Sequence, residues 1–182
     1  MFIFSHIQVT QEMHHAQEFI TSLLEKSFPQ EERRDTKEFW DIVFSSPIVQ
    51  CYIVEQKSIP IAFYYIWNFT DFVYIEFIAV AEAYRSKGLF SSFFQEILQL
   101  FPKTIICEAE RVPTPQAERR LALYKRLGFT ILSETYMQPP FRKSDSPQPM
   151  YLLAYEQNKE TPSTEHIIHT LYTNVYPNIA NL

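Results

Sequence analysis

Two segments of the chain carry residues whose types and spacing suit chemistry. In the first, residues 72–94 (FVYIEFIAVAEAYRSKGLFSSFF), an apolar strand runs into a turn with Arg85, Lys87 and Gly88, and a helix begins directly after it. Backbone N–H groups at such a turn point outward and the helix dipole adds positive potential, which favours an anion such as pyrophosphate. An ordinary strand-turn-helix with solvated cations fits these features equally well.

Glycine is scarce in this sequence, with 2 glycines against 12 prolines. A chain this poor in glycine is expected to keep one where a side chain is excluded, so both positions are candidates for function. Gly88 lies in the first segment. Gly128 closes the second, residues 121–129 (LALYKRLGF), with Tyr124 one helical turn before it. A plain helix end with a core tyrosine is the simpler interpretation of this second segment taken alone.

Glu76 is the only charged residue in the ten residues Phe72–Ala81. Burying an unpaired carboxylate costs free energy, so Glu76 must be partnered, neutral or facing a wet cleft. It is interpreted either as a general base or as a structural hydrogen-bond acceptor. Strand alternation predicts that it shares a face of the sheet with Ile78 and Val80.

Glu108 lies on the next apolar strand and is the rival carboxylate. Glu108 could relay a proton, and structural pairing with Arg119 or Arg120 is an equally good interpretation.

The elements that must position these residues follow from hydrophobic periodicity. Strands dominate the first half and a β-α-β-α-β-β order the second, which predicts a mixed α/β sheet with one parallel pair. Strands are expected over residues 2–9, 49–55, 59–68, 72–80, 103–109, 129–132 and 150–155, and helices over 10–28, 36–45, 88–101, 115–127 and 161–175.

Composition narrows the classes of function. The 182 residues are 46% hydrophobic with a net charge of −5, which indicates a folded chain without a general nucleic-acid surface. The longest apolar run is too short for a membrane span, and no signal peptide is expected. Two cysteines without a framework spacing suit a reducing compartment, so a cytoplasmic location is expected. His166 and His169 are one helical turn apart, but no Glu or Cys completes a set of metal ligands with them, so no metal site is predicted.

Taken together, the two segments resemble the GNAT superfamily of N-acetyltransferases. The pyrophosphate motif of that family matches at Ala79-Val80, Arg85 and Gly88, and its later motif matches at 123–129. Phe90 stands where the family has glycine or alanine, and its side chain is expected to turn into the core face of the helix. The resemblance covers about residues 1–157. Residues 27–33 and 136–142 also look like a bacterial branch of the family with no assigned acceptor.

The resemblance implies a GNAT-like mixed central sheet of about six to seven strands, with helices on both faces and a parallel strand pair splayed at the cofactor cleft. It places an acetyltransferase domain at 1–157, and 158–182 is expected to hold an accessory helix packed on or near it. The implied contacts with acetyl-CoA are Ile78, Ala79, Val80, Arg85, Ser86, Lys87, Gly88, Leu89 and Phe90.

The implied chemistry is direct transfer of an acetyl group from acetyl-CoA to a primary amine in a ternary complex. Glu76 would be the base, Tyr124 would serve the leaving thiolate, and Glu108 and Tyr136 would lie near the acceptor, a small-molecule or peptide amine. The alternatives are a CoA-binding regulatory module without turnover and a structural interaction domain using the terminal helix. Monomer and homodimer both stay open.

Overall fold

The computed structural model describes residues 3–85, 88–156 and 161–176, and within them eight strands form one sheet. The strand order is β1-β2-β3-β4-β5-β8-β6, and the short β7 pairs with β8. The strands are β1 (Ser5–Gln8), β2 (Val49–Gln56), β3 (Ile59–Asn68), β4 (Phe72–Val80), β5 (Thr104–Glu110), β6 (Thr130–Ser133), β7 (Met137–Gln138) and β8 (Gln148–Tyr155). This confirms the mixed α/β sheet, with β7 as an addition that the sequence pattern did not predict.

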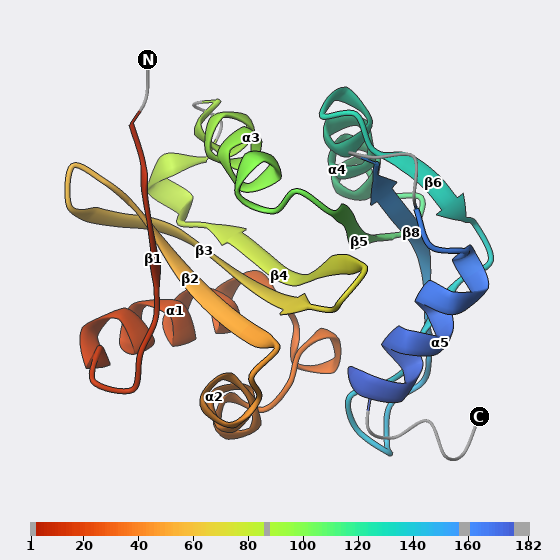
Figure 1. Ribbon diagram of the computed structural model, residues 1–182, viewed down its shortest axis with the longest axis horizontal. Helices are drawn as coiled ribbons and strands as arrows, with labels where there is room; N and C mark the ends of the chain where they lie inside the picture. Colours follow the sequence, from red (N-terminus) through yellow and green to blue (C-terminus); the bar gives the residue numbers. More distant parts are fainter. Residues whose placement is uncertain (1–2, 86–87, 157–160, 177–182) are drawn as a thin grey trace.

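Helices cover both faces of this sheet (Figure 1). The helix α1 (His14–Ser27) and α2 (Thr36–Ser45) lie on one face, whereas α3 (Leu89–Leu100) and α4 (Pro115–Arg126) lie on the other. Each face has its own buried cluster, because apolar rows at helical spacing pack on alternate residues of the strands. Below, the two sides are named the α1–α2 face and the α3–α4 face.

The parallel pair β4–β5 is the feature that opens the sheet. Its ladder joins only Phe72–Ile75 to Thr104–Cys107, although β4 continues to Val80 and β5 to Glu110. The two strands therefore part toward their carboxyl ends, which is the edge where open α/β sheets bind ligands.

A β-bulge on β4 corrects one expectation from the sequence. Tyr65 opposes Phe77 while Ile66 opposes Ile75, so Glu76 is an extra residue in the ladder. Such an extra residue inverts the alternation of side chains that follow it. As a result Glu76 reaches Trp67 in the cluster of the α1–α2 face, whereas Ile78 and Val80 belong to the opposite cluster. The prediction that all three share a face was wrong for this reason.

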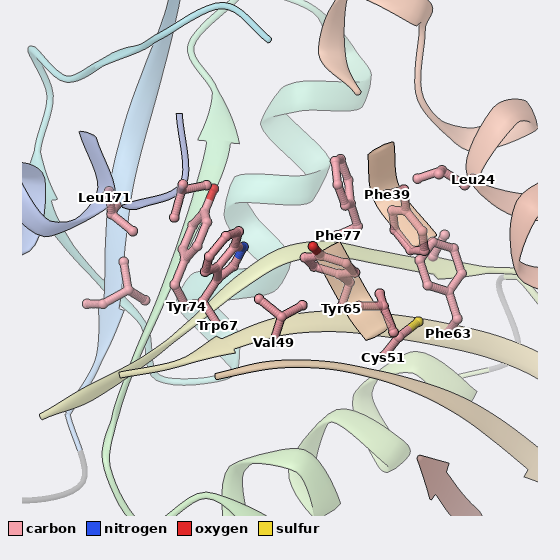
Figure 2. Close-up of a cluster of buried hydrophobic side chains, with 14 of the residues drawn as sticks. Leu24, Phe39, Val49, Cys51, Phe63, Tyr65, Trp67, Tyr74, Phe77 and Leu171 are labelled. Atoms are coloured by element: carbon pink, nitrogen blue, oxygen red, sulfur yellow. The ribbon is translucent and has the colours of Figure 1, made fainter. Parts of the chain in front are cut away.

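The core of the α1–α2 face is largely aromatic (Figure 2). Tyr65 packs between Phe39 and Phe77, with ring centroids 4.6 and 5.8 Å away. Further along the same face, Trp67 and Tyr74 lie side by side in Figure 2. These last two rings carry polar ends, an indole N–H and a hydroxyl, that reach the site described below.

The C-terminal segment packs into this same core. Helix α5 (Thr164–Asn174) buries Ile167 and Leu171 there, and Val175 and Tyr176 follow it into the cluster. The longest helix in residues 3–85, 88–156 and 161–176 has 14 residues, and none there combines the length and hydropathy that a membrane crossing requires.

Candidate active site

The amino end of α3 presents backbone donors beside the β4–β5 opening. Gly88 is the N-cap residue with φ +71°, a left-handed conformation that favours glycine, and none of the described side chains caps the helix. The first N–H groups of a helix lack acceptors within it. The first helical bond here runs from the amide of Ser92 to the carbonyl of Gly88. A Cβ built at Gly88 meets no described atom within 4 Å, so an anionic group can approach the backbone closely.

Arg85 ties this turn to two other elements. Its Nε donates to the carbonyl oxygen of Val80 at 2.9 Å, and its Nη2 donates to the hydroxyl of Ser27 at 3.3 Å. The guanidinium therefore lies where β4 ends and α1 ends. The predicted contacts Ser86 and Lys87 lie outside the described residues.

Phe90 follows one residue into α3. Its ring stacks on Phe94 with centroids 5.2 Å apart and contacts Phe93. The side chain of Phe90 has therefore turned toward the core face of the helix. It leaves the backbone N–H groups of the first turn accessible to an anion.

Glu76 is held by two donors on the α1–α2 face. Arg34 Nε donates to one carboxylate oxygen at 2.9 Å, and the indole N–H of Trp67 donates to the other. The Glu76 side chain is 1% exposed although the residue as a whole is half-buried, so its exposed part is backbone at the opening. Burial raises the pKa of Glu76, and Arg34 and Trp67 act in the opposite direction.

Arg34 is the partner that the sequence analysis required for Glu76 but did not name. The Arg34 side chain is 1% exposed and binds Glu38 at 2.9 Å as well as the carbonyl of Val175. Its guanidinium lies 5.1 Å from the ring of Phe141. Burial acts against the charged form of Arg34, but Glu76, Tyr65 and Glu38 together outweigh burial and raise the pKa of Arg34, so Arg34 stays a cation. The unpaired charge of Glu76 in an apolar strand was the only sequence signal for such a partner.

Glu108 directly follows Cys107, the last residue of β5 that pairs with β4, and lies in a cage of hydroxyl and amide donors. Tyr136 donates to one oxygen at 2.6 Å, Gln138 Nε2 to the other at 2.5 Å, and Tyr176 lies 3.1 Å from both. Burial raises the pKa of Glu108 to about 7, although these hydrogen bonds favour the charged form. The suggested pairing with Arg119 or Arg120 is absent among the described contacts, because Arg120 instead binds Glu110 at 2.7 Å.

Tyr124 lies on the α3–α4 face, away from both carboxylates. It is 5% exposed and packs against Phe94 and Phe129, with centroids 6.2 and 5.4 Å away. Its hydroxyl makes no hydrogen bond to a described residue. Burial raises the pKa of Tyr124, so the phenol keeps its proton at neutral pH.

A pocket lies across the carboxyl end of β5. Glu110 and Arg120 form one wall, and Ser27 and Glu32 come from the end of α1 and the turn after it. Its other lining residues are Glu25, Lys26, Phe28, Pro29, Val112, Thr114, Gln116 and Ala117. Burial and the nearby charge of Glu110 raise the pKa of Glu32. The pocket thus combines three acidic side chains, from Glu25, Glu32 and Glu110, with two basic ones, from Lys26 and Arg120. A separate shallow groove between α1 and α2 contains none of the predicted site residues.

The two segments that look like a bacterial branch of the family meet beside this pocket. Arg142 donates to the carbonyl of Gln30 and to the carboxylate of Asp35. The turn after α1 and the loop before β8 are therefore clamped together over the α1–α2 face. No cluster of three or more metal-ligating side chains occurs in the part of the chain that the structure describes.

Comparison with known proteins identifies the family. Residues 13–129 match the family model for the acetyltransferase (GNAT) family, and the chain belongs to that family. A protein of Bacteroides thetaiotaomicron assigned to the GNAT family is 30% identical, with TM-score 0.89 over 94% of this chain and 98% of that one. Among curated proteins the comparison finds no match.

More distant solved structures share the fold. The ribosomal-protein-S18-alanine N-acetyltransferase of Escherichia coli is 16% identical, with TM-score 0.62 over 88% of this chain and 99% of that one. Spermidine N-acetyltransferase of Vibrio cholerae is 12% identical, with TM-score 0.61 over 86% and 95%. The resemblance stated from the two glycine segments is thus confirmed, and with it the class of protein.

Proposed function

We propose that this protein transfers an acetyl group from acetyl-CoA directly to a primary amine, within a ternary complex. The observation that supports the proposal is that β4 and β5 separate directly after Ile75 and Cys107. The amino end of α3 lies on one side of this opening, and the pocket that contains Glu32 and Glu110 lies at the carboxyl end of β5. A donor and an acceptor can thereby meet at one point. Bound acetyl-CoA supplies the thioester for the transfer.

The donor side of the proposal uses the residues around α3. Gly88 gives the pyrophosphate close access to the N–H groups of Leu89 and Phe90, and Arg85 adds positive charge. The backbone of β4 after Ile75 has no ladder partner on β5 and suits added-strand pairing with the amides of pantetheine around Ile78.

Gly88→Val is expected to weaken acetyl-CoA binding by about tenfold or more, because a left-handed residue with a Cβ is strained and the new side chain enters the anion's approach. Isothermal titration calorimetry with CoA measures the dissociation constant. Gly128→Ala is the control, since Gly128 also has a positive φ, at +98°, but lies at the end of α4. An unchanged affinity in folded Gly88→Val would remove this turn from the donor site.

For proton transfer, the geometry favours Glu108 over Glu76. An amine such as lysine has a pKa near 10.4 and must lose a proton before it attacks. A base works best with a pKa near the working pH, and Glu108 has one of about 7. Glu76 differs from Glu108 in being paired with a buried cation, Arg34, and its role is then to hold that residue.

Tyr124 is proposed to protonate the leaving thiolate. Tyr124→Phe keeps nearly all of the buried volume, so it is expected to leave the melting temperature and CoA affinity unchanged and to lower kcat roughly 10²-fold. The loss should shrink with an acyl donor whose thiol has a lower pKa, because a better leaving group needs less protonation. Equal losses with both donors would argue for a packing role instead.

The acceptor is proposed to be a cationic amine, small molecule or peptide, that enters the pocket of Glu32 and Glu110. The net charge of −5 favours a positively charged acceptor through steering. The structural neighbours include enzymes named for a ribosomal protein and for spermidine, which are both amine acceptors. We further propose a cytoplasmic location, where such amines and acetyl-CoA occur together.

The deciding experiment is a screen of amines with acetyl-CoA, in which release of free thiol is followed. Turnover with at least one amine supports the proposal. Tight CoA binding without thiol release, across diamines, amino acids and peptide N-termini, would favour a regulatory CoA-binding module. Absence of CoA binding would leave a structural role.

A further inference from the structure

The C-terminal segment lies outside the family match, which ends at residue 129, yet its last described residues enter the site. Helix α5 anchors the segment in the core of the α1–α2 face through Ile167 and Leu171, both fully buried. Val175 and Tyr176, each 1% exposed, continue inward from the helix end.

These two residues make polar contacts with both halves of the opened sheet. The carbonyl of Val175 accepts a hydrogen bond from Arg34, the partner of Glu76 on β4. The hydroxyl of Tyr176 lies 3.1 Å from each oxygen of Glu108 on β5. The segment therefore closes the α1–α2 face over the two carboxylates that stand at the start of the opening.

We propose that the last described residues of the chain, Val175 and Tyr176, are part of the acetyl-transfer site and that Tyr176 is a positioning residue, whose hydroxyl holds the Glu108 carboxyl for proton transfer. The inference rests on the proposed function, in which Glu108 accepts the proton of the amine.

The geometry around the Tyr176 hydroxyl carries the argument. This hydroxyl contacts the hydroxyl of Tyr74 at 2.9 Å and Nε2 of Gln138 at 3.1 Å. Because Gln138 Nε2 can only donate, the Tyr176 oxygen accepts there and its own proton is free to point at Glu108. A single hydroxyl thus connects β4, β7 and β5 at one carboxylate.

A carboxyl group that gains and loses a proton needs a partner for both states. Tyr176 can donate to the carboxylate, and its oxygen can accept from the protonated acid, so it fixes Glu108 in either state. The titratable groups facing Glu108 are its neighbour Cys107 on β5, Tyr74 on β4, Tyr136 before β7, and Tyr172 and Tyr176 at the C-terminal end. All are neutral at pH 7, so burial and hydrogen bonds, rather than neighbouring charges, set the titration of this carboxyl.

The test is Tyr176→Phe, which keeps the ring that packs 5.4 Å from Phe141 and removes only the hydroxyl. The hydrogen bond to the charged carboxylate is stronger than the one to the neutral acid, so its loss disfavours the charged form and the titration of Glu108 should move upward by about one pH unit. The carboxyl carbons of ¹³C-labelled glutamate, followed by NMR without substrate, report this shift, and Glu108→Gln assigns the signal.

A matched control is Tyr172→Phe. Tyr172 is on α5, the helix that leads into Tyr176, but its hydroxyl donates to the carbonyl of Met137 at 2.6 Å and makes no described hydrogen bond to Glu108. Removing it should leave both the NMR titration and the acidic limb of the kcat/KM profile in place. Tyr176→Phe should move that limb upward together with the titration, so that activity is lost already at neutral pH.

The outcomes separate the inference from the proposed function. An unshifted Glu108 titration in Tyr176→Phe overturns the inference, as does a shifted titration with an unmoved acidic limb in an active enzyme. Failure of the wild type to turn over any amine overturns the proposed function, while the titration still decides whether Tyr176 holds Glu108. If Tyr176→Phe does not fold, Tyr176→Met supplies a buried side chain without a hydroxyl for the same measurements.

Discussion

Replacing Arg34 by methionine is expected to lower the free energy of unfolding by about 3–5 kcal/mol, because the change leaves Glu76 buried without its cation. The Arg34 and Glu76 side chains are each 1% exposed, so water cannot take over as partner. For a chain of this size the loss corresponds to a fall in melting temperature on the order of 10 °C. Chemical denaturation and thermal melts followed by circular dichroism measure both quantities.

Two further variants test the cause of that loss. Adding Glu76→Gln to Arg34→Met removes the stranded charge and keeps an acceptor for Trp67, so it should recover part of the stability. Lys37→Met breaks an ion pair with Asp41 whose side chains are 86% and 62% exposed, and it should change stability little. If Arg34→Met were as stable as the wild type, the ion pair would not be holding this face together.

Glu108→Gln is expected to lower the rate of acetyl transfer by roughly 10²–10⁴-fold while the fold and CoA binding are retained, the usual range for loss of a general base. The base acts in its deprotonated form, and burial raises the pKa of Glu108 to about 7. Activity of the wild type should therefore fall as the pH drops below about 7. The acidic limb of kcat/KM against pH should disappear in Glu108→Gln.

Glu76→Gln is the companion measurement, because the sequence analysis assigned the base to that residue. With Glu76 held by Arg34 and Trp67, the variant should lose stability but keep an acidic limb near the same pH. Loss of the limb in Glu76→Gln, with its retention in Glu108→Gln, would return the role of base to Glu76.

The sequence determined the local parts of this protein. Leu89, Phe93 and Ile97 recur at helical spacing and are buried in α3, and Thr114-Pro115 begins α4 with a side-chain cap. Both glycines adopt positive φ, +71° at Gly88 and +98° at Gly128. Such features depend on neighbours within a turn or two, so periodicity, capping and turn chemistry predict them. The family followed from the same local motifs.

Only the tertiary structure decided what surrounds the two carboxylates. The bulge at Glu76 depends on the pairing register between β4 and β3, and hydrophobic periodicity in the sequence does not predict that register. Arg34 lies 42 residues from Glu76, and Tyr176 lies 68 residues from Glu108. Contacts at such separations arise when the core closes and brings a helix end, a turn and a chain terminus to one point. The sequence alone therefore predicts that the Glu76 carboxylate needs a partner. Only the packing of the folded chain determines that this partner is Arg34.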